Sequence, residues 1–219
     1  MPILRQRGAT SQPRIIVTLP DSLTEDRIRD LLAARVADPT LGPIRESNSL
    51  LPPQPAAVLV PMLRQDSEWQ LLYILRAKVH GDMHSAQVAF PGGRLDPGET
   101  RAEQAALREA KEEIALDSAR VHLLGNMEDF VTISNYQVTP VVGVIPWPTE
   151  LRPDPREVQR AFTIPLAWLA DPANREERER ASPDGQVLNV VYFKQYDREI
   201  LWGVTARITQ NFLRALELA

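Results

Sequence analysis

Three glutamates lie close together in one stretch of the chain: Glu109, Glu112 and Glu113. In an α-helix, side chains three and four positions apart share a face, so this spacing would gather three carboxylates on one short surface. Like charges at this spacing repel one another, and a divalent cation such as Mg²⁺ or Mn²⁺, which prefers hard oxygen ligands, removes the repulsion. The residues leave a second interpretation open, an acidic solvent-facing helix that pairs with Arg108 and Lys111.

The stretch that carries the glutamates, Thr100–Ala115, is the clearest helix of the sequence. Thr100 followed by Glu103 matches a capping box, which predicts that the helix begins near Thr100. Apolar side chains recur along it at helical spacing: Leu107, Ala110 and Ile114. We therefore expect these apolar residues to face the core and the glutamates to lie on roughly the opposite face.

The residues before this helix predict two turns. Phe90–Gly93 runs from an expected strand into a pair of glycines, where a backbone can approach a ligand closely. Asp96–Glu99, with the sequence DPGE, then leads into the helix. The whole segment, GGRLDPGETRAEQAALREAKEEIAL, resembles the Nudix box of the Nudix hydrolases.

The resemblance implies a fold and an activity. The expected fold class is α+β, a Nudix-type mixed β-sheet sandwiched between helices, with an N-terminal helical extension. The box would be a loop–helix–loop that binds Mg²⁺ or Mn²⁺ and cleaves a nucleoside diphosphate linked to another group, because a cation on the phosphate oxygens neutralises developing charge.

The resemblance also assigns roles to individual residues. The implied metal ligands are Glu109, Glu112, Glu113, the backbone of Gly93, and a later carboxylate for which Glu157 is the candidate. The implied catalytic residues are Glu109, Arg108 and Glu112, with Glu109 orienting or deprotonating the attacking water. Glu99 would support the site structurally by pairing with Arg108.

The segment departs from the usual box at two places. Eight residues separate Glu99 from Arg108 where the family has seven, and Ala115 stands where a glycine usually follows the glutamate pair. The extra residue falls near the expected start of the helix, where a loop can absorb it without rotating the face that carries the carboxylates.

Segments outside the box are similar to coenzyme A pyrophosphatases, a Nudix subfamily. The similar blocks are 71–76, 84–93, 136–143 and 201–208, although Ala77 and Ala86 replace a usual serine and glycine. This similarity implies cleavage of coenzyme A or its thioesters to 4′-phosphopantetheine and adenosine 3′,5′-bisphosphate. The residues expected to bind substrate are Arg76, Lys78, His84, Gly92, Arg94 and Tyr136.

Two other interpretations of function remain open. The first is a Nudix hydrolase acting on ADP-ribose, NADH or a dinucleoside polyphosphate. The second is a non-catalytic Nudix module that binds a nucleotide, although such a module would not need all three glutamates of the helix.

Composition excludes several functional classes. The net charge of −4, from 25 basic and 29 acidic residues, gives no basic field for nucleic acid. The absence of cysteine excludes disulfides and thiolate chemistry. No apolar run approaches the roughly 18 residues of a membrane span. We expect a cytoplasmic enzyme with a small nucleotide substrate, no nucleic-acid or membrane partner, and a homodimer as one possible state.

The chain is expected to divide at the proline-rich connector 52–55. Residues 1–54 would form an extension with one helix at Asp21–Ala37, and residues 55–219 would form the Nudix domain.

Within the domain, the pattern predicts a β-hairpin at residues 56–63 and 70–75, and a final helix at Ile200–Leu218. Glu176–Arg180, a run of mixed charge, is expected to be a solvated loop or helix end. Further strands are expected at 87–90, 121–124, 129–133, 137–145, 161–164 and 187–193.

Overall fold

A computed structural model describes residues 19, 23–36, 44–45, 49–78, 86–181 and 187–219. Its helices are α1 (Glu25–Val36), α2 (Ala102–Ile114), α3 (Leu166–Ala170) and α4 (Gly203–Ala215). Its longer strands are β2 (Gln54–Gln65), β3 (Glu68–Arg76), β6 (His122–Asn126), β8 (Tyr136–Val144), β9 (Val158–Pro165), β10 (Arg175–Ala181) and β11 (Val187–Phe193). Its short strands are β1 (Ile44–Arg45), β4 (Val88–Ala89), β5 (Gly92–Arg94) and β7 (Phe130–Val131).

A mixed sheet forms the centre of the molecule. Its main path runs β1-β7-β8-β2-β3-β4, with β5 added on β2, β6 on β8 and β9 on β3. Strands β2 and β8 are parallel along their length, whereas β2 and β3 form the expected antiparallel hairpin. The combination of parallel and antiparallel pairs explains why the strands alternate irregularly with helices along the sequence.

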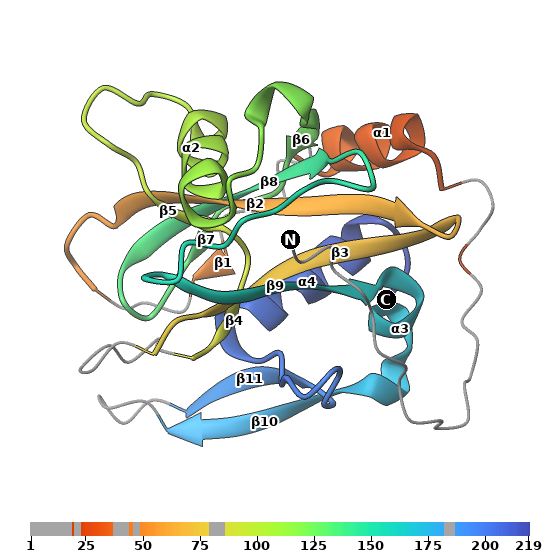
Figure 1. Ribbon diagram of the computed structural model, residues 1–219. Helices are drawn as coiled ribbons and strands as arrows, with labels where there is room; N and C mark the ends of the chain where they lie inside the picture. The colour runs from red at the N-terminus through yellow and green to blue at the C-terminus, as the bar shows by residue number, and fades with distance from the viewer. Residues whose placement is uncertain (1–18, 20–22, 37–43, 46–48, 79–85, 182–186) are drawn as a thin grey trace.

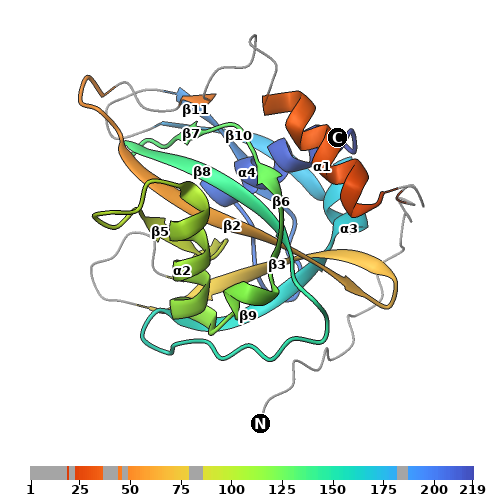
Figure 2. The ribbon, with the colours of Figure 1, turned by 90° about the horizontal axis from the view of Figure 1, so that it is seen from above.

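Helices cover both faces of the sheet, because the central strands are apolar on both sides. In β2, Ala57 and Leu59 pack with α2, whereas Val60 and Met62 pack with α4 in a second core cluster. Successive strand residues point to opposite faces, so an almost continuous apolar run supplies both clusters. Figures 1 and 2 show α2 on one side of the sheet and α4 on the other. The expected Nudix-type sandwich is confirmed.

The N-terminal helix is shorter than expected. It begins at Glu25, after Thr24 accepts the N–H of Arg27 on its side-chain hydroxyl in the manner of an N-cap. Its buried residues Ile28 and Leu32 join the same core cluster as α4. The division of the chain into an extension 1–54 and a domain 55–219 stays a prediction, but the two parts share this core.

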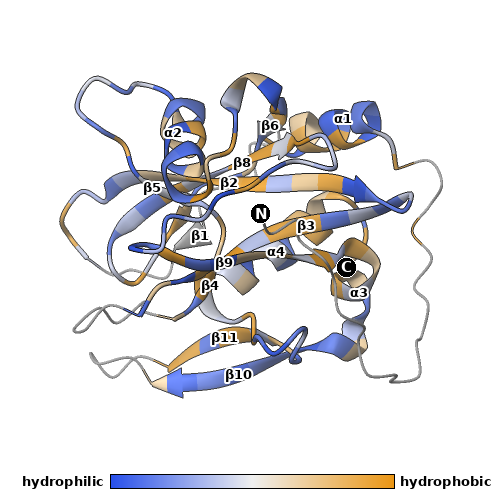
Figure 3. Ribbon diagram, viewed as in Figure 1, coloured by the Kyte–Doolittle hydropathy of each residue, from blue (hydrophilic) through white to orange (hydrophobic). Residues whose placement is uncertain are grey.

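The charged run at Glu176–Arg180 is a strand rather than a loop or helix end. It lies within β10, which pairs with β11 along its full length while most of its side chains remain exposed. Figure 3 shows the contrast between hydrophilic β10 and the more apolar β11. The run of mixed charge did not indicate a strand, because β10 has hardly any apolar residues. The two-stranded ribbon buries mainly residues of β11: Val191, Tyr192 and Phe193.

The other expected elements follow the expected order. The strand expected at 187–193 is confirmed as β11, whereas most of the others have different ends. The last helix starts at Gly203 rather than Ile200, and the strand expected at 87–90 shortens to Val88–Ala89. Among the described helices, none has both the length and the apolar character needed to cross a membrane.

Candidate active site

The site begins where β5 passes under α2. Strand β5 pairs with β2 through Gly92 opposite Val58 and Gly93 opposite Ala57. Neither glycine has room for a side chain. A Cβ on Gly92 would lie 2.4 Å from the carbonyl oxygen of Ala57, and a Cβ on Gly93 would lie 2.2 Å from Oε1 of Glu109. Gly92 therefore lets β5 lie close against β2, and Gly93 lets the strand pass directly beneath the Glu109 carboxylate of α2.

Glu113 is buried between α2 and β5, with only 1% of its surface exposed. This placement corrects the expectation that all three glutamates lie opposite the buried stripe of the helix. The N–H of Gly92 donates to Oε2 of Glu113 at 3.0 Å, and Nη1 of Arg76 lies 3.9 Å from Oε1. Burial raises the pKa of Glu113 to about 8, and the nearby charges of Glu109 and Glu157 act in the same direction.

Glu109 is one helical turn before Glu113 and lies over Gly93. Burial is the main reason why its pKa is raised, and the charges of Glu112 and Glu157 add to the effect, while Arg108 opposes it. Glu112 differs from its neighbours because more than half of its side-chain surface is exposed. The helix thus presents one buried, one half-buried and one exposed carboxylate.

Arg108 connects the helix to the loop before it. Its Nε donates to Oε1 of Glu99 at 3.0 Å, and its Nη2 donates to the carbonyl oxygen of Arg94 at 2.8 Å. Its Nη1 donates to Glu109 at 2.8 Å and to Glu112 at 3.2 Å. The hydrogen bonds to Glu99 are the main reason why the pKa of Arg108 is raised, and the same bonds lower the pKa of Glu99. One planar guanidinium therefore fixes the loop and two carboxylates together.

Helix α2 begins later than expected, at Ala102, with Arg101 as its N-cap. The capping contact comes from Gln104, whose side-chain oxygen accepts the N–H groups of Thr100 and Arg101, both at 3.1 Å. Glu103, the expected capping partner, instead accepts a hydrogen bond from Asn126. The later start places the extra residue of the box in the loop, so the face with the carboxylates is kept.

Glu157 is brought to the site by the segment before β9. The charge of Glu157 adds to the raised pKa of both Glu109 and Glu113. Its backbone carbonyl accepts the N–H of Ala77, the residue after Arg76. Glu157, the later carboxylate predicted from the sequence, thus lies beside the end of β3 that carries Arg76.

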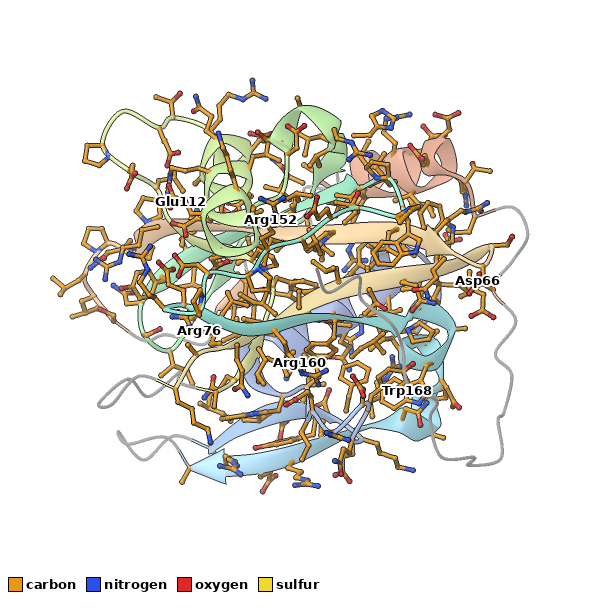
Figure 4. All side chains as sticks on the ribbon, viewed as in Figure 1. Asp66, Arg76, Glu112, Arg152, Arg160 and Trp168 are labelled. Carbon is orange, nitrogen blue, oxygen red and sulfur yellow. The ribbon has the colours of Figure 1, made fainter. Side chains whose placement is uncertain are left out.

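The predicted substrate-binding residues take different positions. Arg94 and Tyr136 lie together, with the guanidinium 5.5 Å from the ring centroid. Lys78 is exposed just beyond the end of β3, and Arg76 is partly exposed at that strand end. Figure 4 shows Arg76 and Glu112 toward one end of the molecule, away from Asp66 and Trp168. His84 lies outside the described residues.

Three residues that contact the site were not predicted from the sequence. Asp96 lies 3.4 Å from Nε of Arg108, Gln104 caps α2, and Asp154 donates its N–H to the carbonyl of Glu113. A signal existed only for Gln104, which stands three residues after the actual N-cap. The contacts of Asp96 and Asp154 depend on how loops fold back, which local patterns do not indicate.

The donor set suits a hard divalent cation. Glu109, Glu113 and Glu157 offer carboxylate oxygens, and burial, with like-charge repulsion added to it, raises the pKa of the first two. Within the described ranges, no three carboxylate or imidazole groups converge closely enough to hold one ion as they stand. The guanidinium of Arg108 donates hydrogen bonds to two of the helix carboxylates, Glu109 and Glu112.

Comparison with protein-family models identifies the family. The model of the NUDIX domain matches residues 52–184, more than half of the chain. The uncharacterized Nudix hydrolase NudL of Yersinia enterocolitica is 34% identical over 172 residues, which cover 74% of this chain and 82% of the relative. NudL of Yersinia pestis is 34% identical over 163 residues, covering 74% and 80%. The chain belongs to the Nudix family, and it is a Nudix hydrolase, an enzyme class that cleaves diphosphate bonds.

Two solved structures are similar to about half of the chain. RenU, a Nudix hydrolase from M. smegmatis, is 24% identical with a TM-score of 0.46, over 54% of this chain and 74% of its own. An Ap4A hydrolase of C. elegans, in a binary complex, is 20% identical with a TM-score of 0.44, over 52% and 80%. These similarities concern the fold alone.

Proposed function

We propose that this Nudix hydrolase cleaves the diphosphate bond of coenzyme A or its thioesters, releasing 4′-phosphopantetheine and adenosine 3′,5′-bisphosphate. The observation that carries the proposal is the position of the segment similar to coenzyme A pyrophosphatases. Residues 71–76 form the end of β3, and residues 87–93 run through β4 into β5. This segment therefore ends at Arg76 and at the two glycines, beside the buried carboxylate of Glu113.

The carboxylates would bind the cation and accept the proton released in hydrolysis. Glu109, Glu112, Glu113 and Glu157 would hold Mg²⁺ or Mn²⁺, which supplies the positive charge that stabilises the diphosphate as its negative charge develops. Water attacks one phosphorus, the bridging P–O bond breaks, and its electron pair leaves with the other phosphate. Glu109, whose carboxylate lies over Gly93 of β5, would accept the proton of the water.

Arg108 would hold the carboxylates in a fixed arrangement. It contacts Glu99, Glu109 and Glu112 at once, so the two helix carboxylates stay aligned with the loop that follows β5. Such alignment reduces the reorganisation that the reaction requires.

Substrate recognition falls to basic and aromatic groups around the carboxylates. Arg76 and Lys78 at the end of β3 would attract the phosphates, and the Arg94–Tyr136 pair would offer a flat surface to the nucleotide. His84 is proposed as a further contact from the sequence alone. The backbone of Gly92, which donates to Glu113, would bring the strand close to the substrate.

A product analysis tests the proposal. The protein is incubated with Mg²⁺ or Mn²⁺ and with coenzyme A, acetyl-coenzyme A, NADH, ADP-ribose or diadenosine polyphosphates, and the products are identified by mass. We expect phosphopantetheine release with the highest kcat/KM of the panel. A preference for ADP-ribose or NADH would overturn the assignment of coenzyme A, and binding without turnover of any compound would favour a non-catalytic module.

Two expectations about the whole protein stay predictions, a cytoplasmic location and a homodimeric state. Fractionation of cells and light scattering of the purified protein address them directly.

A further inference from the structure

The C-terminal end of the catalytic helix is closed by a distant segment of the chain. Helix α2 ends at Ile114, and its last carbonyl groups have no partner within the helix. The N–H of Arg152 donates to the carbonyl of Ile114, and the N–H of Asp154 donates to that of Glu113, both at 2.9 Å. We call residues 150–157 the docking segment, because these bonds attach it to the helix.

Asp154 links the helix to Glu157 through its own backbone. Its N–H contacts Glu113, and its carbonyl accepts the N–H groups of Glu157 at 3.0 Å and Val158 at 2.7 Å. One residue therefore joins the buried carboxylate residue of α2 to the carboxylate residue that precedes β9.

The side chain of Asp154 keeps this turn in shape. It accepts the backbone N–H of Arg156 at 2.9 Å and the guanidinium of the same residue at 2.6 Å. The side chain of Arg156 is 84% exposed, so the ion pair is worth little, whereas the bond to the backbone N–H sets the direction of the chain toward Glu157.

A closed path of contacts then returns to the site. The carbonyl of Glu157 accepts the N–H of Ala77 at 2.7 Å. Ala77 follows Arg76, whose guanidinium lies 3.9 Å from the Glu113 carboxylate. The path runs from Glu113 through Asp154, Glu157, Ala77 and Arg76 back to Glu113. We therefore expect that moving one member changes the spacing of the others.

We propose that Asp154 is a positioning residue, which holds Glu157 beside the C-terminal end of α2 by fixing the docking segment. The inference rests on the proposed function, because Glu157 is given a role in hydrolysis there. It predicts that Asp154 acts on the reaction only through Glu157.

A double-mutant cycle tests this prediction. On the compound that the product analysis shows to be cleaved, Asp154→Ala should lower kcat by about tenfold with KM within about twofold. Asp154→Asn keeps an oxygen for the N–H of Arg156 and should retain at least about half of the wild-type kcat. In Asp154→Ala/Glu157→Gln, kcat should be no lower than in Glu157→Gln alone. Losses that multiply, or an unchanged kcat in Asp154→Ala, would overturn the proposal.

Two further measurements separate this proposal from the assignment of substrate. Hydrogen exchange of the protein without metal or substrate should rise across 152–158 in Asp154→Ala and stay unchanged in Asp154→Asn and in the control Arg156→Ala. Calorimetric titration with Mn²⁺ alone should show weaker binding in Asp154→Ala and no further loss when Glu157→Gln is added.

If no compound is cleaved, the proposed function fails, and hydrogen exchange and Mn²⁺ titration still decide the role of Asp154. Unchanged exchange in Asp154→Ala would refute it. Thermal unfolding of each variant confirms that it is folded.

Discussion

Gly93 of β5 and the Glu109 carboxylate of α2 lie so close together that a methyl group on Gly93 would overlap with the carboxylate. A Cβ on Gly93 would lie 2.2 Å from Oε1 and 2.9 Å from Oε2 of the Glu109 carboxylate, well inside van der Waals contact. The Glu109 carboxylate can therefore keep this position over β5 only with glycine in the strand.

The first prediction follows from this contact. Gly93→Ala should push the Glu109 carboxylate aside and lower kcat/KM by about 100-fold, since a displacement of about 1 Å at reacting groups has effects of this size. Gly98→Ala is the matched control. Gly98 has φ of +101° with no atom within 4 Å of a Cβ, so that variant should lose about 1 kcal/mol of stability and keep its activity. Equal activity in the two variants would contradict the prediction.

The second prediction concerns the fork geometry of Arg108. Arg108→Lys keeps the charge but replaces a planar group, bonded to Glu99, Glu109 and the carbonyl of Arg94, with a single ammonium. We expect kcat to fall by about 10- to 100-fold, measured at saturating substrate. Arg120→Lys, on an exposed 3₁₀ turn, should behave as wild type. If Arg108→Lys were as active as this control, the guanidinium would not organise the site.

The third prediction concerns the exposed carboxylate of the helix. Glu112→Gln keeps the shape of the side chain and removes its charge, so cation binding and turnover should fall, with kcat/KM reduced by about 100-fold. Glu68→Gln, at the exposed start of β3, is the control. Turnover within a fewfold of wild type would show that Glu112 is not a metal ligand.

The fourth prediction is a pH dependence of stability. Burial raises the pKa of Glu113 from 4.5 to about 8, so the folded state of the metal-free protein prefers the protonated carboxyl group. This contribution to stability is fully present below pH 4.5 and is lost as pH rises toward 8. Between those values, the Tm of metal-free wild type should fall relative to that of Glu113→Gln. Parallel Tm curves for the two proteins, measured in chelator, would contradict the assignment.

The fifth prediction concerns the end of α2. Ala115 has a left-handed backbone with φ of +54°, a conformation that costs an alanine about 1 kcal/mol and glycine almost nothing. Ala115→Gly should therefore raise the free energy of unfolding by roughly 0.5–1 kcal/mol in denaturant titration. Ala119→Gly, in the 3₁₀ turn, lacks this conformation and should not stabilise the protein. A loss of stability in Ala115→Gly would show that the helix end gains nothing from the change.

Much of the site could be predicted from the sequence, because its residues are close along the chain. The spacing of Glu109, Glu112 and Glu113 determines their order on a helix, and the glycines of β5 indicate a close approach of backbone. The pairing of Arg108 with Glu99 was also expected, and the two side chains are in contact. These relationships depend on local geometry, which periodicity and turn residues report.

Tertiary structure decided the relationships that involve burial and distant segments. Helical periodicity could not show that Glu113 would be buried, since that depends on β5 lying beneath the helix. Nor could it show that Asp154 closes the helix end or that β10 is a strand, because backbone hydrogen bonds between distant segments leave no side-chain pattern. The sequence by itself determined the order of the candidate carboxylates along the helix and their sharing of one segment with the glycines and Arg108. The pKa values of Glu109 and Glu113 were decided only by packing, because desolvation and like-charge repulsion act on groups that folding buries and brings together.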